Sequence, residues 1–495
     1  MKIKIKSLFT PFNLIVAIIL LAAFFIRVYR IDKLLGFYYD QGRDALVIWD
    51  FWHEGKLFLV GPTTGLAGIF RGPYYYYLIA PFYFLGKGDP IYPTVFLILT
   101  TVAAIGLIYY LGAKIQDRTT GIFAAVLASF SYYVVMASRW LSNPTPMILL
   151  SMVLVWAMLK VTEGKKWGWP IISLSAGLSL FNFGSAGELF YFLAIAIFLI
   201  WQWRWRPDLK NLVISVFLFV LTFAPLVLFD VRHEGILRNN MLTTFVEEKS
   251  FTAPTKFFLE NRTQFYYDVF TNKIFHSRGT RELMFLSLIG IAFILFLPKL
   301  IKNKGVKILL ILLVSPMVGL YFYQGNYTVL YDYYLTGYYL IFILLFAVVL
   351  GRFWKTTLGK AFVSLFFIMF LFNNFEVLSL KLGDRLDGPG SIGFSLQKQA
   401  IDWIYQDSQG GSFNVDVYVP PVIPYAYDYL FKWYGGTNHG RLPLEEKVPL
   451  LYTLYEGQPA DSERLDAWLK RQAGIGKVID RERFGGIIVE RRDRL

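Results

Sequence analysis

The sequence predicts an all-α polytopic membrane protein that carries a small soluble α/β domain at its C-terminal end. Hydrophobic residues make up 56% of the 495 residues, and charged residues make up only 17%. Soluble domains contain about 25% charged residues. Apolar runs recur along most of this chain, and about 20 mostly apolar residues are enough for a helix to cross a bilayer. These observations predict that membrane helices form most of the structure.

Apolar runs of suitable length predict about eleven membrane-spanning helices. The predicted spans are residues 11–29, 91–112, 120–137, 144–161, 169–183, 188–203, 211–229, 284–301, 306–323, 335–351 and 358–377. The first run follows three lysines, as the apolar part of a signal peptide does, but no small-residue cleavage site comes after it. We therefore expect a retained first helix.

Basic residues gather in alternate turns between these spans, which is the pattern of cytoplasmic loops. The basic residues of the turns assigned to the cytoplasm are Lys2, Lys4, Lys6, Lys114, Arg118, Lys160, Lys165, Lys166, Arg204, Arg206, Lys210, Lys299, Lys302, Lys304, Lys307, Arg352, Lys355 and Lys360. The net charge of +14 therefore indicates topology and does not indicate a nucleic-acid partner. An odd number of spans predicts a multi-pass cell-membrane protein with a cytoplasmic N-terminus and an extracytoplasmic C-terminal domain.

The sequence divides into a transmembrane domain over residues 1–379 and an extracytoplasmic α/β domain over residues 380–495. In the first domain, residues 31–90 form an outer loop with interfacial helices, and residues 230–283 form a second outer loop. In the tail, apolar periodicity and alternation predict two helices and two strands. These tail elements are helices at 396–407 and 462–471 and strands at 413–419 and 485–489.

Metal-binding and thiol chemistry find little support in the composition. Cysteine is absent, which excludes disulfides, thiolate catalysis and cysteine-ligated metals. The four histidines are scattered and show no zinc-ligand spacing. We therefore expect no dedicated zinc site.

An acidic pair stands at the start of a predicted helix in the first outer loop. Asp40 and Asp44 are four residues apart, so both can face one side of that helix. Asp40 could act as an N-cap that accepts hydrogen bonds from free backbone N–H groups. It could also be a fixed catalytic carboxylate, and the two roles are compatible.

Basic and acidic residues also collect at the outer ends of other predicted helices. Arg71 precedes four tyrosines beginning at Tyr74, and Arg139 lies in a very short outer turn. Either arginine could simply pair with lipid phosphate or anchor the chain at the interface. Glu188 and Asp332 also lie at predicted outer helix ends, where structural roles are an alternative. The polar residues thus gather at one membrane face, whereas transporters place such groups near the bilayer centre.

At these residues the chain resembles the GT-C membrane glycosyltransferases, and its nearest branch is similar to bacterial protein O-mannosyltransferase relatives and lipid A aminoarabinose transferases (glycosyltransferase family 39 and 83 types). The resemblance covers about residues 10–350. It depends on ordered motifs at 27–30, 40–41, 71–75, 138–139 and 332–335. The sequence departs from the family pattern at Gln41, which replaces a second acid, and at Asp332, which stands where a basic residue is common.

The resemblance implies an inverting hexosyl- or pentosyltransferase. Such enzymes move a sugar from a polyprenyl-phosphate carrier to a lipid, glycan or protein acceptor at the extracytoplasmic face, in contact with membrane lipids. The implied site consists of catalytic Asp40 and Asp44, donor-phosphate ligands Arg71 and Arg139, and substrate contacts Arg43, Tyr74, Glu188, Asp332 and Tyr333. No cofactor is required, although Asp40 and Asp44 could hold a divalent cation.

Two other functions remain open at this point. One is a flippase or transporter for lipid-linked sugars. The other is an oligosaccharyl transferase that uses a pyrophosphate carrier, which calls for a metal held by several acidic groups. The acidic residues at the outer face are sparse for such a metal site.

Overall fold

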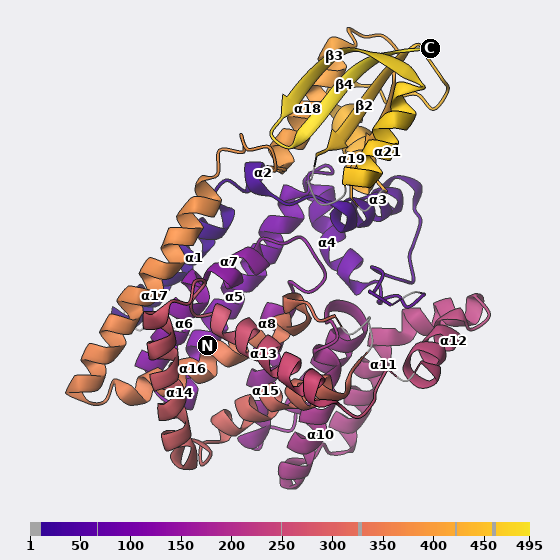
Figure 1. Ribbon diagram of the computed structural model, residues 1–495. Coiled ribbons are helices and arrows are strands. Elements are labelled where there is room, and N and C mark those ends of the chain that lie inside the picture. Colours follow the sequence, from indigo (N-terminus) through magenta and orange to yellow (C-terminus); the bar gives the residue numbers. More distant parts are fainter. Residues whose placement is uncertain (1–10, 67, 249, 325–328, 421–422, 458–461) are drawn as a thin grey trace, which may run out of the picture.

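The computed structural model describes residues 11–66, 68–248, 250–324, 329–420, 423–457 and 462–495. A helical bundle forms the larger part, and a small domain with a β-sheet sits at one end of it (Figure 1). Lys2, Lys4 and Lys6, which contribute to the expected orientation, lie outside the described residues.

Seven helical segments of the described residues are long and apolar enough to cross a membrane. They are α1 (Pro11–Val28), α5 (Ile91–Ile115), α11 (Leu209–Arg232), α14 (Thr280–Leu300), α15 (Lys304–Phe322), the segment Asp332–Phe353 and α17 (Thr357–Gly383). The segment Asp332–Phe353 consists of the 3₁₀ helix η7 (Asp332–Tyr338) and α16 (Tyr339–Phe353). In its most apolar stretch of 18 residues, 94% of the residues are buried, against 17% in α1, so it is a central helix of the bundle.

The other apolar segments are shorter or bent. They are α6 (Arg118–Phe130), α7 (Tyr132–Ser138), α8 (Met147–Thr162), α9 (Gly168–Leu178) with the π-helix η2 (Ser179–Phe183), and η3 (Glu188–Phe190) with α10 (Tyr191–Trp201). Each predicted span coincides with helical structure. The predicted fold class is confirmed, and the number of spans stays a prediction because length and apolarity alone support seven, or eight if the bent pair α6–α7 is one span.

The break between α6 and α7 is stabilised by buried polar side chains. The axis bends by 65° at Ser131. The fully buried Arg27 donates hydrogen bonds to the carbonyls of Ala128 and Ser129, both at 2.9 Å. The Asn374 side chain accepts a hydrogen bond from the Tyr132 amide at 2.8 Å. Carbonyl and amide groups freed by the bend therefore find partners inside the bundle.

Short helices cover the end of the bundle that faces the small domain. They are α2 (Ile31–Leu34), α3 (Tyr39–Glu54) and α4 (Tyr74–Leu85). Three further helices connect α11 with α14. They are α12 (Ile236–Leu242), the π-helix η5 (Thr243–Glu247) and α13 (Lys256–Asn272). These groups fall in the two segments for which the sequence predicts outer loops.

The small domain contains a four-stranded sheet of order β1-β2-β4-β3. Its strands are β1 (Asn414–Tyr418), β2 (Leu450–Glu456), β3 (Gly476–Phe484) and β4 (Ile487–Arg494). β1 and β2 are parallel, whereas β4 is antiparallel to β2 and β3. Its helices are α18 (Phe394–Asp407), α19 (Tyr425–Leu430), η8 (Phe431–Gly435), α20 (Gly436–His439) and α21 (Ser462–Ala473). Sequence reasoning missed β2 and β3.

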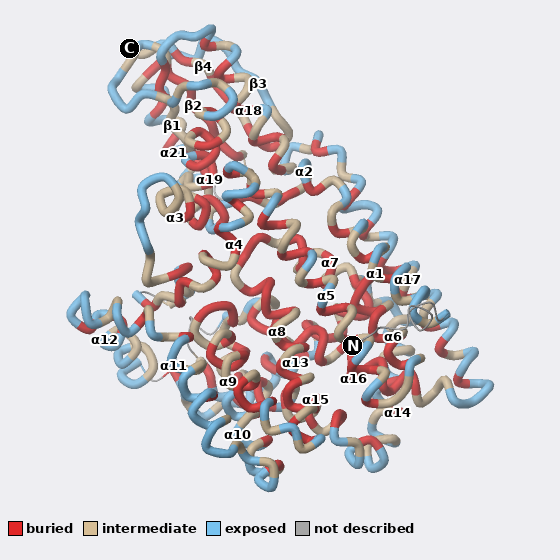
Figure 2. The backbone as a smooth tube through the Cα atoms, turned by 180° about the vertical axis from the view of Figure 1, so that it is seen from behind, coloured by how far each residue is buried: buried red, intermediate tan, exposed pale blue. Residues whose placement is uncertain are grey.

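The small domain packs on the bundle mainly where α19 meets α3. Buried residues continue from α3 into α19 (Figure 2). Lys432 forms an ion pair with Asp50 of α3 at 2.9 Å. The Trp433 indole N–H donates a hydrogen bond to the Lys87 carbonyl at 2.9 Å. The helix that carries the predicted acidic pair is therefore in direct contact with the small domain.

Candidate active site

The first turn of α3 leaves the Asp40 carboxylate available for chemistry. The helix begins at Tyr39, and the Gln41 side chain accepts a hydrogen bond from the Tyr38 amide at 3.1 Å. Gln41 also donates to the Leu141 carbonyl at 3.1 Å, which anchors the helix to the short turn before α8. The alternative that Asp40 caps this helix is wrong, because the helix starts one residue earlier and Gln41 supplies the capping contact.

Arg43 connects the two acidic residues of α3. Its Nη1 lies 2.9 Å from Oδ1 of Asp40, and its Nη2 lies 2.7 Å from Oδ1 of Asp44. Tyr76 of α4 donates to the same Asp44 oxygen at 2.9 Å, and Thr63 accepts from Arg43 at 2.8 Å. The Asp44 side chain is 7% exposed and that of Asp40 is 55% exposed. Asp44 thus holds Arg43 in place, while Asp40 faces open space.

Arg71 reaches the same space from a tight loop. Its backbone pairs with Gly61 and Pro62, at 2.7 and 3.0 Å. The next residue, Gly72, donates to the Phe181 carbonyl at 2.6 Å, and a β-carbon at Gly72 would overlap the Asn182 side chain. Only glycine permits this approach of the loop to η2. The packing fixes the backbone that presents Arg71.

A cavity of about 400 Å³ brings these groups together. Asp40, Arg43, Asp44 and Arg71 supply its charged lining. Its apolar and aromatic lining includes Leu66, Ile69, Phe70, Phe181, Leu226, Phe245, Tyr323, Tyr333 and Tyr334. No ion pair within the described part of the chain engages Arg71. Burial lowers the pKa of Arg71, and the charge of Glu188 opposes this shift. We call this space the acidic-pair cavity.

Glu188 does not line the acidic-pair cavity but stabilises the backbone next to it. It is 1% exposed, and its two oxygens accept from the Ser185 and Gly337 amides at 2.7 and 2.8 Å. These bonds join the start of η3 to η7, where the segment carrying Tyr333 begins. Both carboxylate oxygens are therefore used in holding the backbone.

The remaining predicted site residues divide between other environments. The Tyr74 hydroxyl donates to the Leu221 carbonyl at 2.7 Å. Asp332 forms an ion pair with the buried Lys273 at 2.7 Å and accepts from the Tyr339 hydroxyl. Arg139 donates to the Arg27 carbonyl at 2.6 Å and lines a second cavity. Of the predicted residues, only Asp40, Arg43, Asp44, Arg71 and Tyr333 line the acidic-pair cavity.

Sequence reasoning missed three residues that shape this region. The sequence marks Gln41 only as a departure from the family pattern, yet it anchors α3. Trp140 lines both cavities. Lys273 is fully buried against Tyr133 and Tyr339, and a lone lysine near the end of α13 gives no sequence signal for this contact.

No group of three or more histidine, cysteine, aspartate or glutamate side chains in the described ranges is placed to hold a metal ion. Asp40 and Asp44 are both engaged by Arg43. The described residues therefore provide no ligand cluster that would support a divalent cation at Asp40 and Asp44.

Comparison with known proteins identifies the type of fold. Residues 61–229 match the family described as dolichyl-phosphate-mannose-protein mannosyltransferase. This segment contains Arg71, Arg139 and Glu188 but not Asp40. No curated protein sequence matches the chain.

Solved structures with a similar fold extend the comparison to the whole chain. ArnT from Cupriavidus metallidurans bound to undecaprenyl phosphate matches with a TM-score of 0.63 at 11% identity, over 97% of each chain. Its apo state matches with a TM-score of 0.61, also at 11% identity and over 97% of each chain. An oligosaccharyltransferase from Archaeoglobus fulgidus, tethered with an acceptor peptide, matches with a TM-score of 0.50 at 11% identity, over 88% of this chain and 64% of that chain.

The family match and the fold agree with the resemblance predicted from the ordered motifs. That prediction and the prediction of a membrane glycosyltransferase are confirmed at this level: the chain has the fold of GT-C glycosyltransferases, and its residues 61–229 match a family of such enzymes.

Proposed function

We propose that this chain transfers a sugar from a polyprenyl-phosphate carrier to a lipid, glycan or protein acceptor, with inversion at the anomeric carbon. One observation carries the proposal. The acidic-pair cavity places the exposed carboxylate of Asp40 and the unpaired cation of Arg71 around one space of about 400 Å³. A base and a phosphate-binding cation are the two groups that this reaction needs.

Asp40 acts as the general base. The acceptor hydroxyl gives its proton to the Asp40 carboxylate while its oxygen forms a bond to the anomeric carbon. The bond between that carbon and the phosphate oxygen breaks, and the carrier phosphate leaves with the electron pair. A positioned base of this kind contributes roughly 10²–10⁴-fold to the rate.

Arg71 stabilises the leaving phosphate. A guanidinium can contact two phosphate oxygens at once. A cation fixed in advance also needs little rearrangement as the negative charge develops. Arg71 fits this role because backbone hydrogen bonds hold its position and no ion pair among the described residues engages it. Asp44 and Arg43 act as positioning residues that set the charge beside Asp40.

The apolar part of the cavity suits the lipid carrier. Leu226 belongs to α11, and Phe181 belongs to η2 at the end of α9. These residues connect the charged lining with the membrane helices. A polyprenyl chain can therefore enter from the bilayer while its phosphate meets Arg71. Polar residues gathered at one end of the bundle also favour transfer chemistry over transport through the membrane.

Orientation follows from the distribution of basic residues. We place the N-terminus in the cytoplasm, the acidic-pair cavity at the extracytoplasmic face and the domain of residues 380–495 outside the cell membrane. The transmembrane catalytic domain then comprises residues 1–379.

Single-turnover sugar transfer tests the proposal. The full chain in nanodiscs is mixed with radiolabelled undecaprenyl-phosphate hexoses and pentoses and with membranes from a strain that lacks the gene. Asp40→Asn keeps the size of the side chain and removes the base, so transfer should slow on the order of 10²-fold or more with donor binding retained. Asp32→Asn, an exposed carboxylate on α2, is the matched control. Near-normal transfer by Asp40→Asn would overturn the assignment of the base.

A further inference from the structure

A third cavity, of about 640 Å³, lies between α3 and α4. We call it the apolar groove. Its lining comes from the second half of α3, including Ile48, Phe51 and Trp52, and from α4, including Tyr77. No charged side chain of the described residues lines it, and the Tyr77 hydroxyl already donates to the Phe58 carbonyl at 2.9 Å. The groove therefore suits an apolar ligand and does not suit a sugar or a phosphate.

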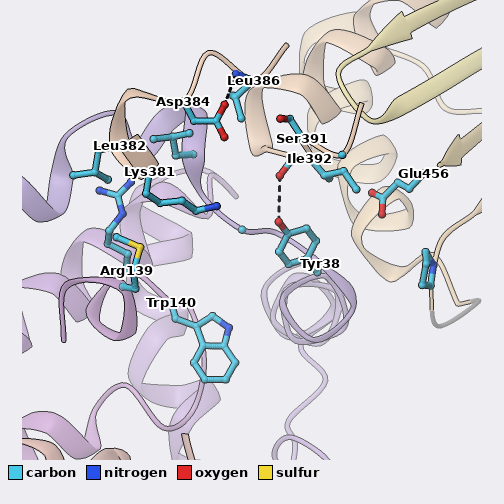
Figure 3. A pocket seen from close by; sticks show the side chains of 15 residues that line it. Tyr38, Arg139, Trp140, Lys381, Leu382, Asp384, Leu386, Ser391, Ile392 and Glu456 are labelled. Carbon is cyan, nitrogen blue, oxygen red and sulfur yellow. Dashed lines mark hydrogen bonds between the residues drawn. The ribbon is translucent and has the colours of Figure 1, made fainter. Parts of the chain in front are cut away.

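The apolar groove is separate from the other two cavities. Within the described part of the chain it shares no lining residue with the acidic-pair cavity. The same holds for the cavity of about 590 Å³ that Arg139 and Trp140 line (Figure 3). The lining of the acidic-pair cavity gives the polyprenyl carrier a path that does not use the groove. The groove is therefore available to a different molecule.

The apolar groove continues into the exposed surface of a membrane helix. Residues 86–90 join the end of α4 to the span α5. Phe82 of α4 stacks on Phe96 of α5, with ring centroids 3.8 Å apart. Phe84 of α4 is 59% exposed, and Tyr92 in the first turn of α5 is 50% exposed. The groove therefore lies beside the end of a span, at the level where aromatic side chains meet the bilayer surface.

The apolar groove also involves the helix that carries the proposed base. Ile48 follows Asp44 by four residues and Phe51 follows Ile48 by three, so these three residues lie along one side of α3. Asp44 lines the acidic-pair cavity, whereas Phe51 lines the groove. A ligand in the groove therefore contacts the second half of the helix whose first turn carries the base.

We propose that the apolar groove binds an acyl chain of a bilayer phospholipid. The chain packs against Phe51, Trp52 and Phe84, while the headgroup stays at the membrane surface. Contacts with these aromatic rings supply the affinity, because a chain that comes from the bilayer gains little from the hydrophobic effect. The inference goes beyond sugar transfer, since this lipid is neither the carrier nor the acceptor. A bound chain fixes the second half of α3.

Native mass spectrometry of the full chain tests the inference. The protein is released from nanodiscs of phosphatidylglycerol and phosphatidylethanolamine, and the phospholipid that stays bound is weighed. The wild type should retain a phospholipid that Phe84→Ser largely loses, because this change removes one aromatic wall. The matched control is Phe217→Ser in the span α11, since Phe217 is 63% exposed and lies outside the groove. Ala80→Phe, which fills the groove, should lose the same lipid.

Spin labels provide a second measurement in an intact bilayer. The chain has no cysteine, so Leu85→Cys in the groove lining accepts a single label. In nanodiscs this label should collide more often with oxygen, which partitions into acyl chains, than with a water-soluble nickel complex. A label at Ile479→Cys is the control, because Ile479 is 52% exposed on β3 of the small domain. This label should show the opposite preference.

Several results would overturn the inference. Equal retention of phospholipid by the wild type, Phe84→Ser and Phe217→Ser shows that the groove binds none. A preference for the nickel complex at Leu85→Cys places the groove in water. Displacement of the retained phospholipid by added undecaprenyl phosphate assigns the groove to the carrier, and a dimer mass lost only in Phe84→Ser assigns it to a second copy of the chain. Neither measurement uses sugar transfer, so each of these results leaves the proposed function to its own test.

Discussion

Gly42 of α3 packs directly against the backbone of Ala426 in α19. A β-carbon at Gly42 would overlap the backbone atoms of Ala426 and Tyr425. Gly42 lies between Asp40 and Asp44 in the sequence, so the small domain rests on the turn of α3 that carries both acids. The domain therefore helps to fix the position of the proposed base.

Gly42→Ala should separate α3 from α19 and reduce both stability and transfer. Overpacking of this kind costs about 1–3 kcal/mol, and backbone atoms cannot move aside as a side chain can. We expect a lower midpoint of thermal unfolding and a rate reduced at least several-fold. Gly290→Ala in α14 is the control, because nothing lies within 4 Å of its β-carbon position. Equal behaviour of the two variants would contradict the close contact.

Arg71→Ala should slow sugar transfer strongly. Removing one fixed charge-stabilising donor typically costs about 3–4 kcal/mol, or about 10²–10³-fold in rate. Arg71→Lys keeps the charge but not the paired N–H groups, so it should recover only part of the loss. Single-turnover rates at varied undecaprenyl-phosphate sugar provide the measurement. Arg232→Ala, which changes an exposed arginine at the end of α11, should match the wild type. Wild-type turnover of Arg71→Ala at limiting donor would remove Arg71 from the donor site.

The rate of transfer should depend on pH through Asp44. Burial raises the pKa of Asp44 to about 6, against the opposing charge of Arg43. Above this value Asp44 is ionised and holds Arg43. As the pH falls through about 6, Asp44 gains a proton and Arg43 keeps only Asp40 as a charged partner, which makes Asp40 a weaker base.

A pH profile of transfer between about pH 5 and pH 8 measures this effect. The wild-type rate should fall toward acid by up to about tenfold per pH unit. In Asp44→Asn the inflection near 6 should be absent, and the rate should be lower throughout. If Asp44→Asn keeps the wild-type inflection, another group is responsible for it.

The sequence predicts the membrane helices well because apolar length is a local property. It does not predict the 65° bend at Ser131, which depends on Arg27 from a different helix. The sequence does not predict strand β3, because its residues are mostly charged and exposed, as is common for an edge strand. Its place is set by pairing with β4. The bend thus depends on a residue far away in the chain, whereas the strand depends on pairing with its neighbour β4 and not on its own composition.

In the candidate site too, the sequence predicts the local features but not those that depend on contacts with distant residues. The spacing of Asp40 and Asp44 correctly places both on one side of α3, where Arg43 meets them. The sequence could not show that Gln41 anchors α3 to the bundle, because its partner there is the distant Leu141 carbonyl. It also could not separate Arg71 from Arg139, since two arginines at one membrane face look equivalent until the cavities are known.

Reporter fusions test the proposed orientation. Alkaline phosphatase fused after Leu495 should be active, and green fluorescent protein at the same place should stay dark, because the small domain lies outside. The control fusion point is Asn303, between α14 and α15, where basic residues predict a cytoplasmic turn. There the two reporters should give the opposite result. An active cytoplasmic reporter at Leu495 would reverse the orientation and with it the face on which transfer occurs.

The ion pair between Lys273 and Asp332 should be more important for stability than an exposed pair. Lys273 is 0% exposed and Asp332 is 41% exposed, and they lie 2.7 Å apart. Asp332→Asn leaves a buried ammonium without its counter-charge, which typically costs about 3–5 kcal/mol. Replacing Lys273 by Met as well removes the stranded charge. We therefore expect Lys273→Met/Asp332→Asn to unfold at a higher temperature than Asp332→Asn alone.

Transfer should also be faster in Lys273→Met/Asp332→Asn than in Asp332→Asn alone. The reason is that Asp332 directly precedes Tyr333, which lines the acidic-pair cavity. The matched control is Asp268→Asn, whose partner Arg278 is 22% exposed while Asp268 is 37% exposed. Partly exposed pairs contribute only about 0–1 kcal/mol, so this variant should lose little. Thermal unfolding and single-turnover transfer of all four proteins, including the wild type, give the comparison. If the double variant is no better than Asp332→Asn in both measurements, the buried charge does not explain the loss, and Asp332 would have to act on substrate directly, as the family resemblance implies.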